Sequence, residues 1–340
     1  MTTVGFVGAG LIGSERIKAF AALAREGLPL RAVGVIDPHN PKVSALAASI
    51  DAPVLVNVDD LIKIKPDLVV IAIPHDTARD VAASFLDAGI RVVLEKPLGR
   101  TLEEAKVLAA KQKYAGQLSV GYNFRFFEGV RHFMQDVRSG FFGTPISLNF
   151  TLGHGGSPED LKGWKLDPIR AGGGCLIDPG VHLLDLACQA EQGRLDVRGG
   201  NSWSGFWKTG IEEDCHLVLA GQTIPTIQIN VSIVRWRSTF RIEFFGTEKY
   251  GIVEGRGRSY GPQTYRRGGR WGWQQGKPQI ETEEIVVTTS GDQVFADEMR
   301  ALLQPDKQHG ASVATADESV RVMELLARCR TALGLRHELE

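Results

Sequence analysis

The chain has 340 residues, of which 43% are hydrophobic and 23% charged, and its formal net charge is -1. This length favours about two domains, and the composition is that of a globular chain, which argues against disorder. A near-zero net charge gives no general attraction to nucleic acid or to an anionic membrane, so we expect neither partner.

Cysteine usage and the N-terminus indicate the expected compartment. The cysteines show no C-x-x-C spacing and no histidine at metal-ligand spacing, so we expect reduced thiols and no metal. No secretory signal opens the chain, and no apolar run approaches the roughly 20 residues that cross a bilayer. We therefore predict a cytoplasmic protein.

Short β-branched runs alternate with amphipathic helical patterns over residues 1–121. This alternation is typical of βαβ units, in which helices cover both faces of a parallel sheet. The strand-like runs lie at residues 4–7, 31–36, 68–73, 91–94 and 118–122.

A glycine motif follows the first of these runs and opens the first helical pattern. Gly8, Gly10 and Gly13 have G-x-G-x-x-G spacing, which lets the backbone approach a pyrophosphate at a helix N-terminus. Asp37 ends the second strand, where an acid binds the adenosine ribose and repels a 2′-phosphate; the alternative is that Asp37 only forms a turn before Pro38. Residues 1–121 are therefore predicted to form a Rossmann domain that binds NAD. NADP stays open as the less favoured cofactor, because His39 and Lys42 follow closely.

Ligands of open α/β sheets bind beyond the carboxyl ends of the strands. Lys96 follows the run 91–94, so it points toward the predicted cofactor, where a lysine can serve as acid, base or hydrogen-bond donor. A solvated lysine is the alternative. The other residues assigned to the cofactor lie at strand ends and at the start of the first helix: Leu11, Ile12, Pro74 and Glu95.

The pattern changes after residue 121. We expect a helix, a Gly-rich loop, a second helix, a series of strands and two closing helices, at residues 129–139, 153–174, 179–190, 195–287, 292–303 and 316–333. These elements predict a second α/β domain at 122–340, with a large, mostly antiparallel open sheet.

An aspartate and a histidine follow the glycine run 172–174. We expect Asp178 to cap a helix that begins at Pro179, which puts Asp178 and His182 one turn apart on one face. A carboxylate beside an imidazole fixes its tautomer, which suits a general base acting on an alcohol. The glycines would let the backbone approach a flat ligand such as nicotinamide. The alternative is purely structural, with Asp178 as a simple cap and His182 as a core histidine.

Taken together, four motifs resemble the Gfo/Idh/MocA family of oxidoreductases: GFVGAGLIG, VVLEKPLG, VGYNFRF and WKLDPIRAGGGCLIDPGVHLLD. The resemblance implies a Rossmann domain followed by an α/β domain whose sheet often serves as an oligomer interface. It implies that Lys96, Asp178 and His182 form the catalytic set. The substrate residues predicted with it are Asn123, Arg125, His154, Trp164, Lys165, Asp178 and His182. Members often have Thr-Pro-Asn and a later histidine where this chain has Ile73, Pro74, His75 and Ala78.

Residues 250–279 have no counterpart in that family pattern. Arginines interleave there with aromatic residues, as in single-stranded nucleic-acid binding, but the near-zero net charge argues against that partner. We expect a twisted hairpin arm with exposed aromatics, used in subunit contact or at the rim of the pocket, and an ordinary long hairpin is the alternative. An open sheet would also need a partner for its apolar face, so we predict a homodimer or homotetramer.

These features predict an NAD-dependent dehydrogenase that oxidises a secondary alcohol of a small carbohydrate or polyol. His182 would take the hydroxyl proton, Asp178 would orient His182, and Lys96 would hydrogen-bond the reacting oxygen or share the proton transfer. Two alternatives stay open: an NAD-dependent glycosidase of the same fold without net redox, and a non-catalytic NAD-binding regulator.

Overall fold

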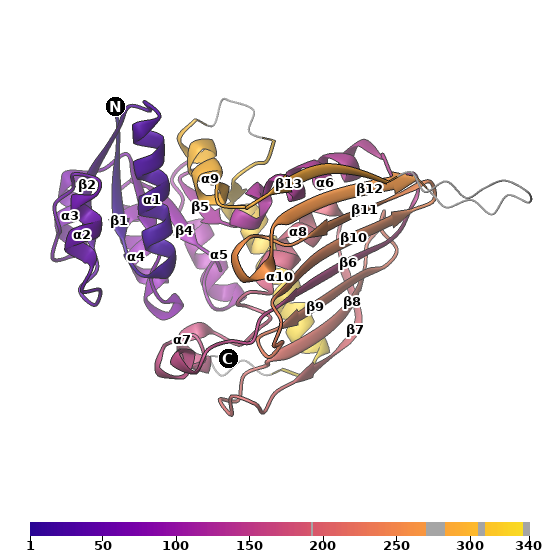
Figure 1. The fold of residues 1–340 in the computed structure, drawn as a ribbon. Coiled ribbons are helices and arrows are strands. Elements are labelled where there is room, and N and C mark those ends of the chain that lie inside the picture. Colours follow the sequence, from indigo (N-terminus) through magenta and orange to yellow (C-terminus); the bar gives the residue numbers. More distant parts are fainter. Residues whose placement is uncertain (192, 270–282, 305–309, 336–340) are drawn as a thin grey trace, which may run out of the picture.

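The computed structural model describes residues 1–191, 193–269, 283–304 and 310–335, and two sheets lie side by side in it (Figure 1). The first sheet has six strands in the order β14-β5-β4-β3-β1-β2, parallel except for β14. Its strands are β1 (Thr2–Val7), β2 (Leu30–Ile36), β3 (Leu68–Ile71), β4 (Arg91–Glu95), β5 (Leu118–Gly121) and β14 (Ala314–Thr315).

Helices cover both faces of this sheet, which explains why β3 is buried along its whole length. They are α1 (Leu11–Arg25), α2 (Val43–Ala48), α3 (Val58–Ile64), α4 (His75–Asp87) and α5 (Leu102–Ala110). The side chains of Asn57 and Thr101 accept hydrogen bonds from backbone amides and thereby fix the starts of α3 and α5. This is the Rossmann-type domain that the sequence predicts, although β14 joins it from the far end of the chain.

The second sheet has eight strands in the order β13-β12-β11-β10-β6-β9-β8-β7, antiparallel except for the β6–β9 pair. The strands are β6 (Pro145–Gly153), β7 (Asp196–Trp203), β8 (Asp214–Ala220), β9 (Ile227–Ser232), β10 (Thr239–Gly246), β11 (Lys249–Glu254), β12 (Gln263–Gly269) and β13 (Glu283–Thr289). The large, mostly antiparallel sheet is therefore confirmed. Strand β6 in its centre is not among the expected strands.

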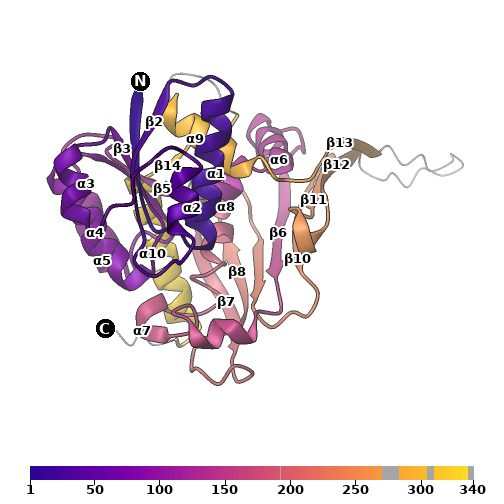
Figure 2. The same ribbon diagram turned by 60° about the vertical axis from the view of Figure 1, so that its left-hand side comes forward.

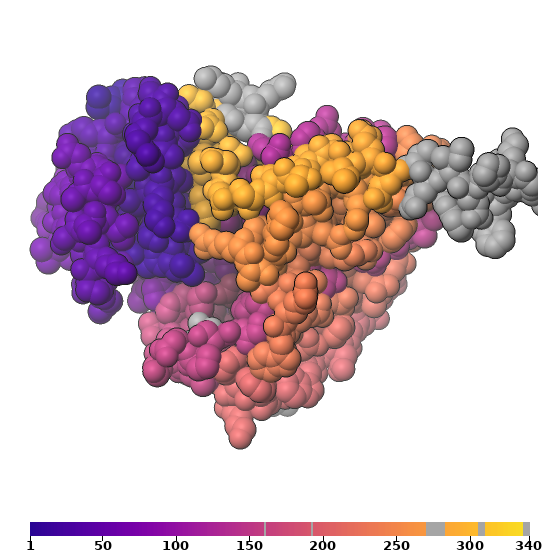
Figure 3. Space-filling model, viewed as in Figure 1, coloured from indigo at the N-terminus to yellow at the C-terminus, as the bar shows by residue number. Residues whose placement is uncertain are grey.

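Several helices lie between the two sheets (Figure 2). The remaining helical elements are η1 (Asn123–Phe126), α6 (Glu128–Ser139), η2 (Pro158–Lys162), α7 (Pro168–Ala171), α8 (Val181–Ala190), η3 (Arg258–Tyr260), α9 (Val294–Leu303) and α10 (Ala316–Ala332). Helix α10 contacts α5 of the first domain as well as α8 and β7 of the second, and α9 packs on α1. In Figure 3 the orange-yellow segment that contains α9 lies beside the indigo N-terminal part of the chain. Of the helices described, none is long and apolar enough to span a membrane.

The outer face of the large sheet carries both polar and apolar side chains. Along β10, buried phenylalanine and isoleucine residues alternate with outward Arg241 and Glu243. Arg241 pairs with Glu243 at 2.8 Å and with Glu254, which also binds Arg266. Phe245 of the same strand and Val218 of β8 also point outward and are 37% and 41% exposed, so apolar side chains share this face with the ion pairs. The homo-oligomer stays a prediction.

The described part of residues 250–279 belongs to the sheet. Tyr265 is fully buried, and its hydroxyl donates to Asp136, which also pairs with Arg267 at 2.8 Å. The predicted arm with exposed aromatics is therefore wrong for β11 and β12, since Tyr250 is half-buried and Tyr265 is buried. Arg270, Trp271 and Trp273 lie outside the described residues.

Candidate active site

A cleft of about 660 Å³ opens at the carboxyl ends of β1, β2, β3 and β4. Its volume is in the range of small-molecule sites. The opposite wall comes from the segment between β6 and α8. The predicted site residues that line the cleft are Gly8, Gly10, Leu11, Ile12, Asp37, Pro74, Glu95, Lys96, Trp164, Lys165 and Asp178.

The turn between β1 and α1 fits a dinucleotide. Gly8 has a φ of +93°, which favours glycine, and a Cβ on Gly10 would meet no atom within 4 Å, so the backbone there is open to a ligand. No side chain caps the N-terminus of α1, whose first amides can therefore receive an anion. Gly13 lies under the turn, where a Cβ would overlap the backbone of Gly8.

Asp37 organises the adjoining edge of the cleft. Its Oδ2 accepts a hydrogen bond from the amide of Ala9 at 2.7 Å, and its Oδ1 accepts from the amides of His39 and Asn40 at 3.0 Å each. These bonds fix a carboxylate at the end of β2, on the wall of the cleft.

Asp178 lies between two lysines in the cleft. Lys96 Nζ donates a hydrogen bond to Oδ1, and Lys165 Nζ lies 3.7 Å from Oδ2. Burial favours a higher pKa for Asp178, but the positive charges of Lys96 and Lys165 outweigh it and hold this pKa far below its usual range. The carboxylate is therefore ionised, and it anchors both lysine side chains.

The helix that follows does not begin as predicted. Helix α8 starts at Val181, its N-cap is Gly180, and no side chain caps it. The prediction that Asp178 caps a helix from Pro179 is wrong, because the lysines bind its carboxylate in the turn before α8. Among the described contacts, Asp178 makes no hydrogen bond to His182.

His182 is 5% exposed and stacks on Phe124, with ring centroids 4.0 Å apart. Its Nδ1 is buried and has no hydrogen-bond partner among the described residues. Burial lowers the pKa of His182 well below its ordinary value, and Lys96 lowers it further, while Asp178 opposes the shift. The imidazole is therefore neutral, and it is not among the residues that line the cleft.

Besides His182, the structure places three predicted substrate residues away from the cleft wall. Arg125 Nε donates to Asp185 at 2.8 Å, with the two side chains 4% and 1% exposed, and its Nη1 lies 3.2 Å from Glu318. His154 Nδ1 accepts from a backbone amide in the loop after β6. Asn123 is half-buried at the start of η1.

Sequence reasoning missed His75 as a site residue. It lines the cleft, lies edge-on to Trp164 with ring centroids 4.5 Å apart, and its Nδ1 is 2.8 Å from the carbonyl oxygen of Ala171. A carbonyl only accepts, so Nδ1 carries the hydrogen and Nε2 is the free acceptor. Burial, together with the charge of Lys96, lowers the pKa of His75 to about 4. The available signal was its place directly after Pro74, at the end of a strand.

A buried ion cluster supports the Lys96 end of β4. Arg16 is fully buried and lies 2.7 Å from Glu95 and 2.6 Å from Glu298. These two ion pairs join α1, β4 and α9. Among the residues described, no three His, Cys, Asp or Glu side chains gather as a potential metal site.

Curated relatives of this chain include dehydrogenases of small polyhydroxy compounds. Levoglucosan dehydrogenase of Pseudarthrobacter phenanthrenivorans is 29% identical over 54% of this chain and 50% of that protein. Inositol 2-dehydrogenase of Rhizobium meliloti is 30% identical over 54% and 53%, respectively. The chain therefore spans about half the length of these relatives.

Solved structures match the fold over nearly the whole chain. Levoglucosan dehydrogenase in complex with NADH and L-sorbose has a TM-score of 0.80 at 16% identity, covering 98% of this chain and 97% of that one. UDP-N-acetylglucosamine 3-dehydrogenase from Acidithiobacillus ferrooxidans has a TM-score of 0.75 at 20% identity, covering 97% of each chain.

Two family descriptions match the two parts of the chain. Residues 2–122 match an oxidoreductase family with an NAD-binding Rossmann fold, and residues 130–250 match the GFO/IDH/MocA C-terminal domain. With both parts matched in order, the chain belongs to the GFO/IDH/MocA family of oxidoreductases, which bind NAD(P) on a Rossmann domain.

Proposed function

We propose that this protein is an NAD-dependent dehydrogenase that oxidises a secondary alcohol of a carbohydrate or polyol. The observation that carries the proposal is the Lys96–Asp178 ion pair, which lines the same cleft as the dinucleotide turn. The names of the relatives, among them D-glucoside 3-dehydrogenase and inositol 2-dehydrogenase, support this substrate class.

Lys96 is suited to hold the reacting hydroxyl. A lysine ammonium has three donors, so Lys96 can bind Asp178 and still donate to the alcohol oxygen. This bond strengthens as negative charge develops on that oxygen, which lowers the barrier. Asp178 keeps this ammonium in place and also pairs with Lys165.

His182 is the proposed proton acceptor. A general base must start unprotonated, and burial keeps His182 neutral. The negative charge of Asp178 raises its proton affinity, so the two residues are coupled by charge rather than by a hydrogen bond. Lys96 is the alternative acceptor: as a neutral amine it would take the hydroxyl proton and become the ammonium that pairs with Asp178. A nicotinamide bound in the cleft would supply the hydride acceptor.

Two features support the finer choices of cofactor and substrate. Asp37 places a negative charge at the end of β2, where it would repel the 2′-phosphate of NADP. Trp164 and Lys165 line the far end of the cleft and combine an apolar ring with a hydrogen-bond donor, which suits a polyhydroxylated ring.

A substrate screen tests the proposal. The purified protein would be offered sugars and polyols with NAD or with NADP, while absorbance reports the reduced cofactor. We expect NADH to accumulate with at least one compound in the wild type, and we expect Lys96→Met to form no NADH with that compound. Aglycone release from aryl glycosides without NADH would instead identify a glycosidase, and NAD binding without any turnover would identify a regulator.

A further inference from the structure

Three side chains converge on the backbone carbonyls of residues 169–172, at the C-terminal end of α7. The contacts are His75 Nδ1 to the oxygen of Ala171 (2.8 Å), Arg100 Nη1 to the oxygen of Ile169 (2.9 Å), and Arg330 Nη2 to the oxygen of Gly172. The last carbonyls of a helix have no partner within the helix, so N–H donors from elsewhere satisfy them. The three donors come from α4, the β4–α5 connection and α10, so three distant segments hold one turn.

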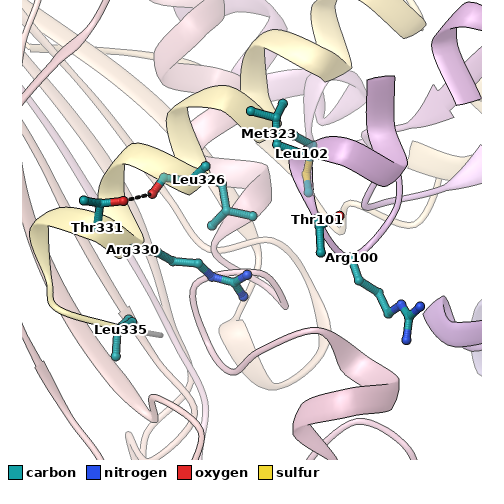
Figure 4. A pocket seen from close by; sticks show the side chains of 9 residues that line it. Arg100, Thr101, Leu102, Met323, Leu326, Arg330, Thr331 and Leu335 are labelled. Atoms are coloured by element: carbon teal, nitrogen blue, oxygen red, sulfur yellow. Dashed lines mark hydrogen bonds between the residues drawn. The ribbon is translucent and has the colours of Figure 1, made fainter. Parts of the chain in front are cut away.

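Arg330 is the most remote of these donors, in the last helix of the chain. It is 8% exposed and is not among the residues that line the cleft. Figure 4 shows Arg330 reaching from α10 and Arg100 from the first domain. Gly173 has a φ of +141°, and a Cβ there would overlap Arg330 Nη2, so the glycine allows this close approach. Packing against Arg330 therefore gives a reason for Gly173, while the approach of a nicotinamide to the glycine run stays a prediction.

The stretch 169–172 belongs to the part of the second domain that lines the cleft. Trp164 and Lys165 precede it, Arg170 lies within it, and Asp178 follows six residues after Gly172. We call residues 169–178 the aspartate turn. On the other side of the ion pair, Arg100 follows Lys96 by four residues, so one connection carries both Lys96 and a donor to the aspartate turn.

We propose that Arg330 is a positioning residue, which fixes the aspartate turn so that Asp178 meets Lys96. Arg330 itself touches neither substrate nor cofactor. Its role in turnover rests on the proposed function, whereas its hold on the turn does not. A displacement of about 1 Å in a reacting group can cost roughly a hundredfold in rate, so a remote bond of this kind matters to catalysis.

The first test compares two arginines of α10. Arg330→Met removes the donor to Gly172 and keeps an unbranched apolar side chain. The matched control is Arg328→Met, since Arg328 also donates to a backbone carbonyl, but to that of Leu195 beside β7. With the substrate found in the screen, we expect Arg330→Met to lower kcat about ten- to a hundredfold. NAD affinity should stay as in the wild type, and Arg328→Met should keep the wild-type kcat.

Chemical rescue separates positioning from general stability. Guanidinium ion at a concentration that does not denature the protein should restore part of the kcat of Arg330→Ala, while the same concentration of potassium chloride should not. Arg330→Lys keeps the charge but loses the planar guanidinium, so its kcat should lie between those of the wild type and Arg330→Met. It also provides a folded variant if Arg330→Met does not fold.

Hydrogen exchange tests the inference without any substrate. The amide of Cys175 donates to Glu212 and that of Asp178 donates to Gly174, so both report on the aspartate turn. Exchange over residues 172–178 should be faster in the Arg330 variants and unchanged in Arg328→Met. Wild-type exchange there together with wild-type kcat in the Arg330 variants would overturn the inference. A screen without any substrate would instead refute the proposed function and leave this comparison valid.

Discussion

The Arg125–Asp185 pair provides the sharpest contrast between the sequence prediction and the structure. The resemblance assigns Arg125 to the substrate, whereas the structure buries it against Asp185 with side chains 4% and 1% exposed. Removing one member of a buried pair leaves an uncompensated charge and costs about 3–5 kcal/mol. Burial already raises the pKa of Asp185 against the opposing charge of Arg125, so without the arginine the carboxyl would take up a proton. This proton uptake removes the unpaired charge, so we expect Arg125→Met to lower the free energy of unfolding by about 3 kcal/mol, the lower end of that range.

An exposed pair of the same length is the control. Arg170 Nε lies 2.8 Å from Asp76, but these side chains are 44% and 23% exposed. Solvent screens such a pair, so Arg170→Met should cost only about 0–1 kcal/mol.

Urea unfolding followed by circular dichroism measures both variants. The double variant Arg125→Met/Asp185→Leu should regain most of the lost stability, because both charges leave the interior together. If Arg125→Met keeps wild-type stability and instead raises KM for the sugar, Arg125 is a substrate residue and the structural reasoning is refuted.

Three further predictions concern the cofactor, the base and pH. Asp37→Ser should lower the ratio of kcat/KM for NAD to that for NADP, and a wild-type preference for NADP would contradict the role of Asp37. His182→Asn should lower kcat by about a hundredfold to ten-thousandfold with unchanged NAD binding, while full turnover would exclude it as the base. The pKa of His75 falls from 6.5 unfolded to about 4 folded, so its contribution to stability is present above pH 6.5 and is lost as pH falls toward 4. Through this residue, the free energy of unfolding should be about 2 kcal/mol lower at pH 5 than at pH 7. In His75→Asn the difference between the two pH values should be smaller by that amount.

Local periodicity was enough to predict the Rossmann domain. Strands such as β3 are continuous apolar runs, and the glycine turn has fixed spacing, so each element can be recognised from neighbouring residues. Strand β6 was missed although its sequence PISLNFTLG alternates apolar and polar residues, which is the local pattern of a half-buried strand. What the sequence does not show is its central place in the sheet, which depends on pairing with β9 and β10. Strand β14 has two residues and exists only through its pairing with β5.

The site was predictable where its residues share a motif. Lys96 and Asp178 each lie in a recognisable pattern, and both line the cleft. The Asp-Pro sequence looks like a helix cap with proline at the first helical position, but Lys96 and Lys165 redirect the carboxylate. Arg330 binds Gly172 across 158 positions, and no local pattern indicates so distant a contact.

Transfer of deuterium tests the central claim most directly. A sugar or polyol that the screen identifies would carry deuterium on the carbon to be oxidised, and mass spectrometry would follow the label in the cofactor. The proposed dehydrogenase should move the label to NAD and release the ketone, and Lys96→Met should abolish the transfer. Label that stays on the sugar, or returns to it as a glycoside is cleaved, would contradict the account.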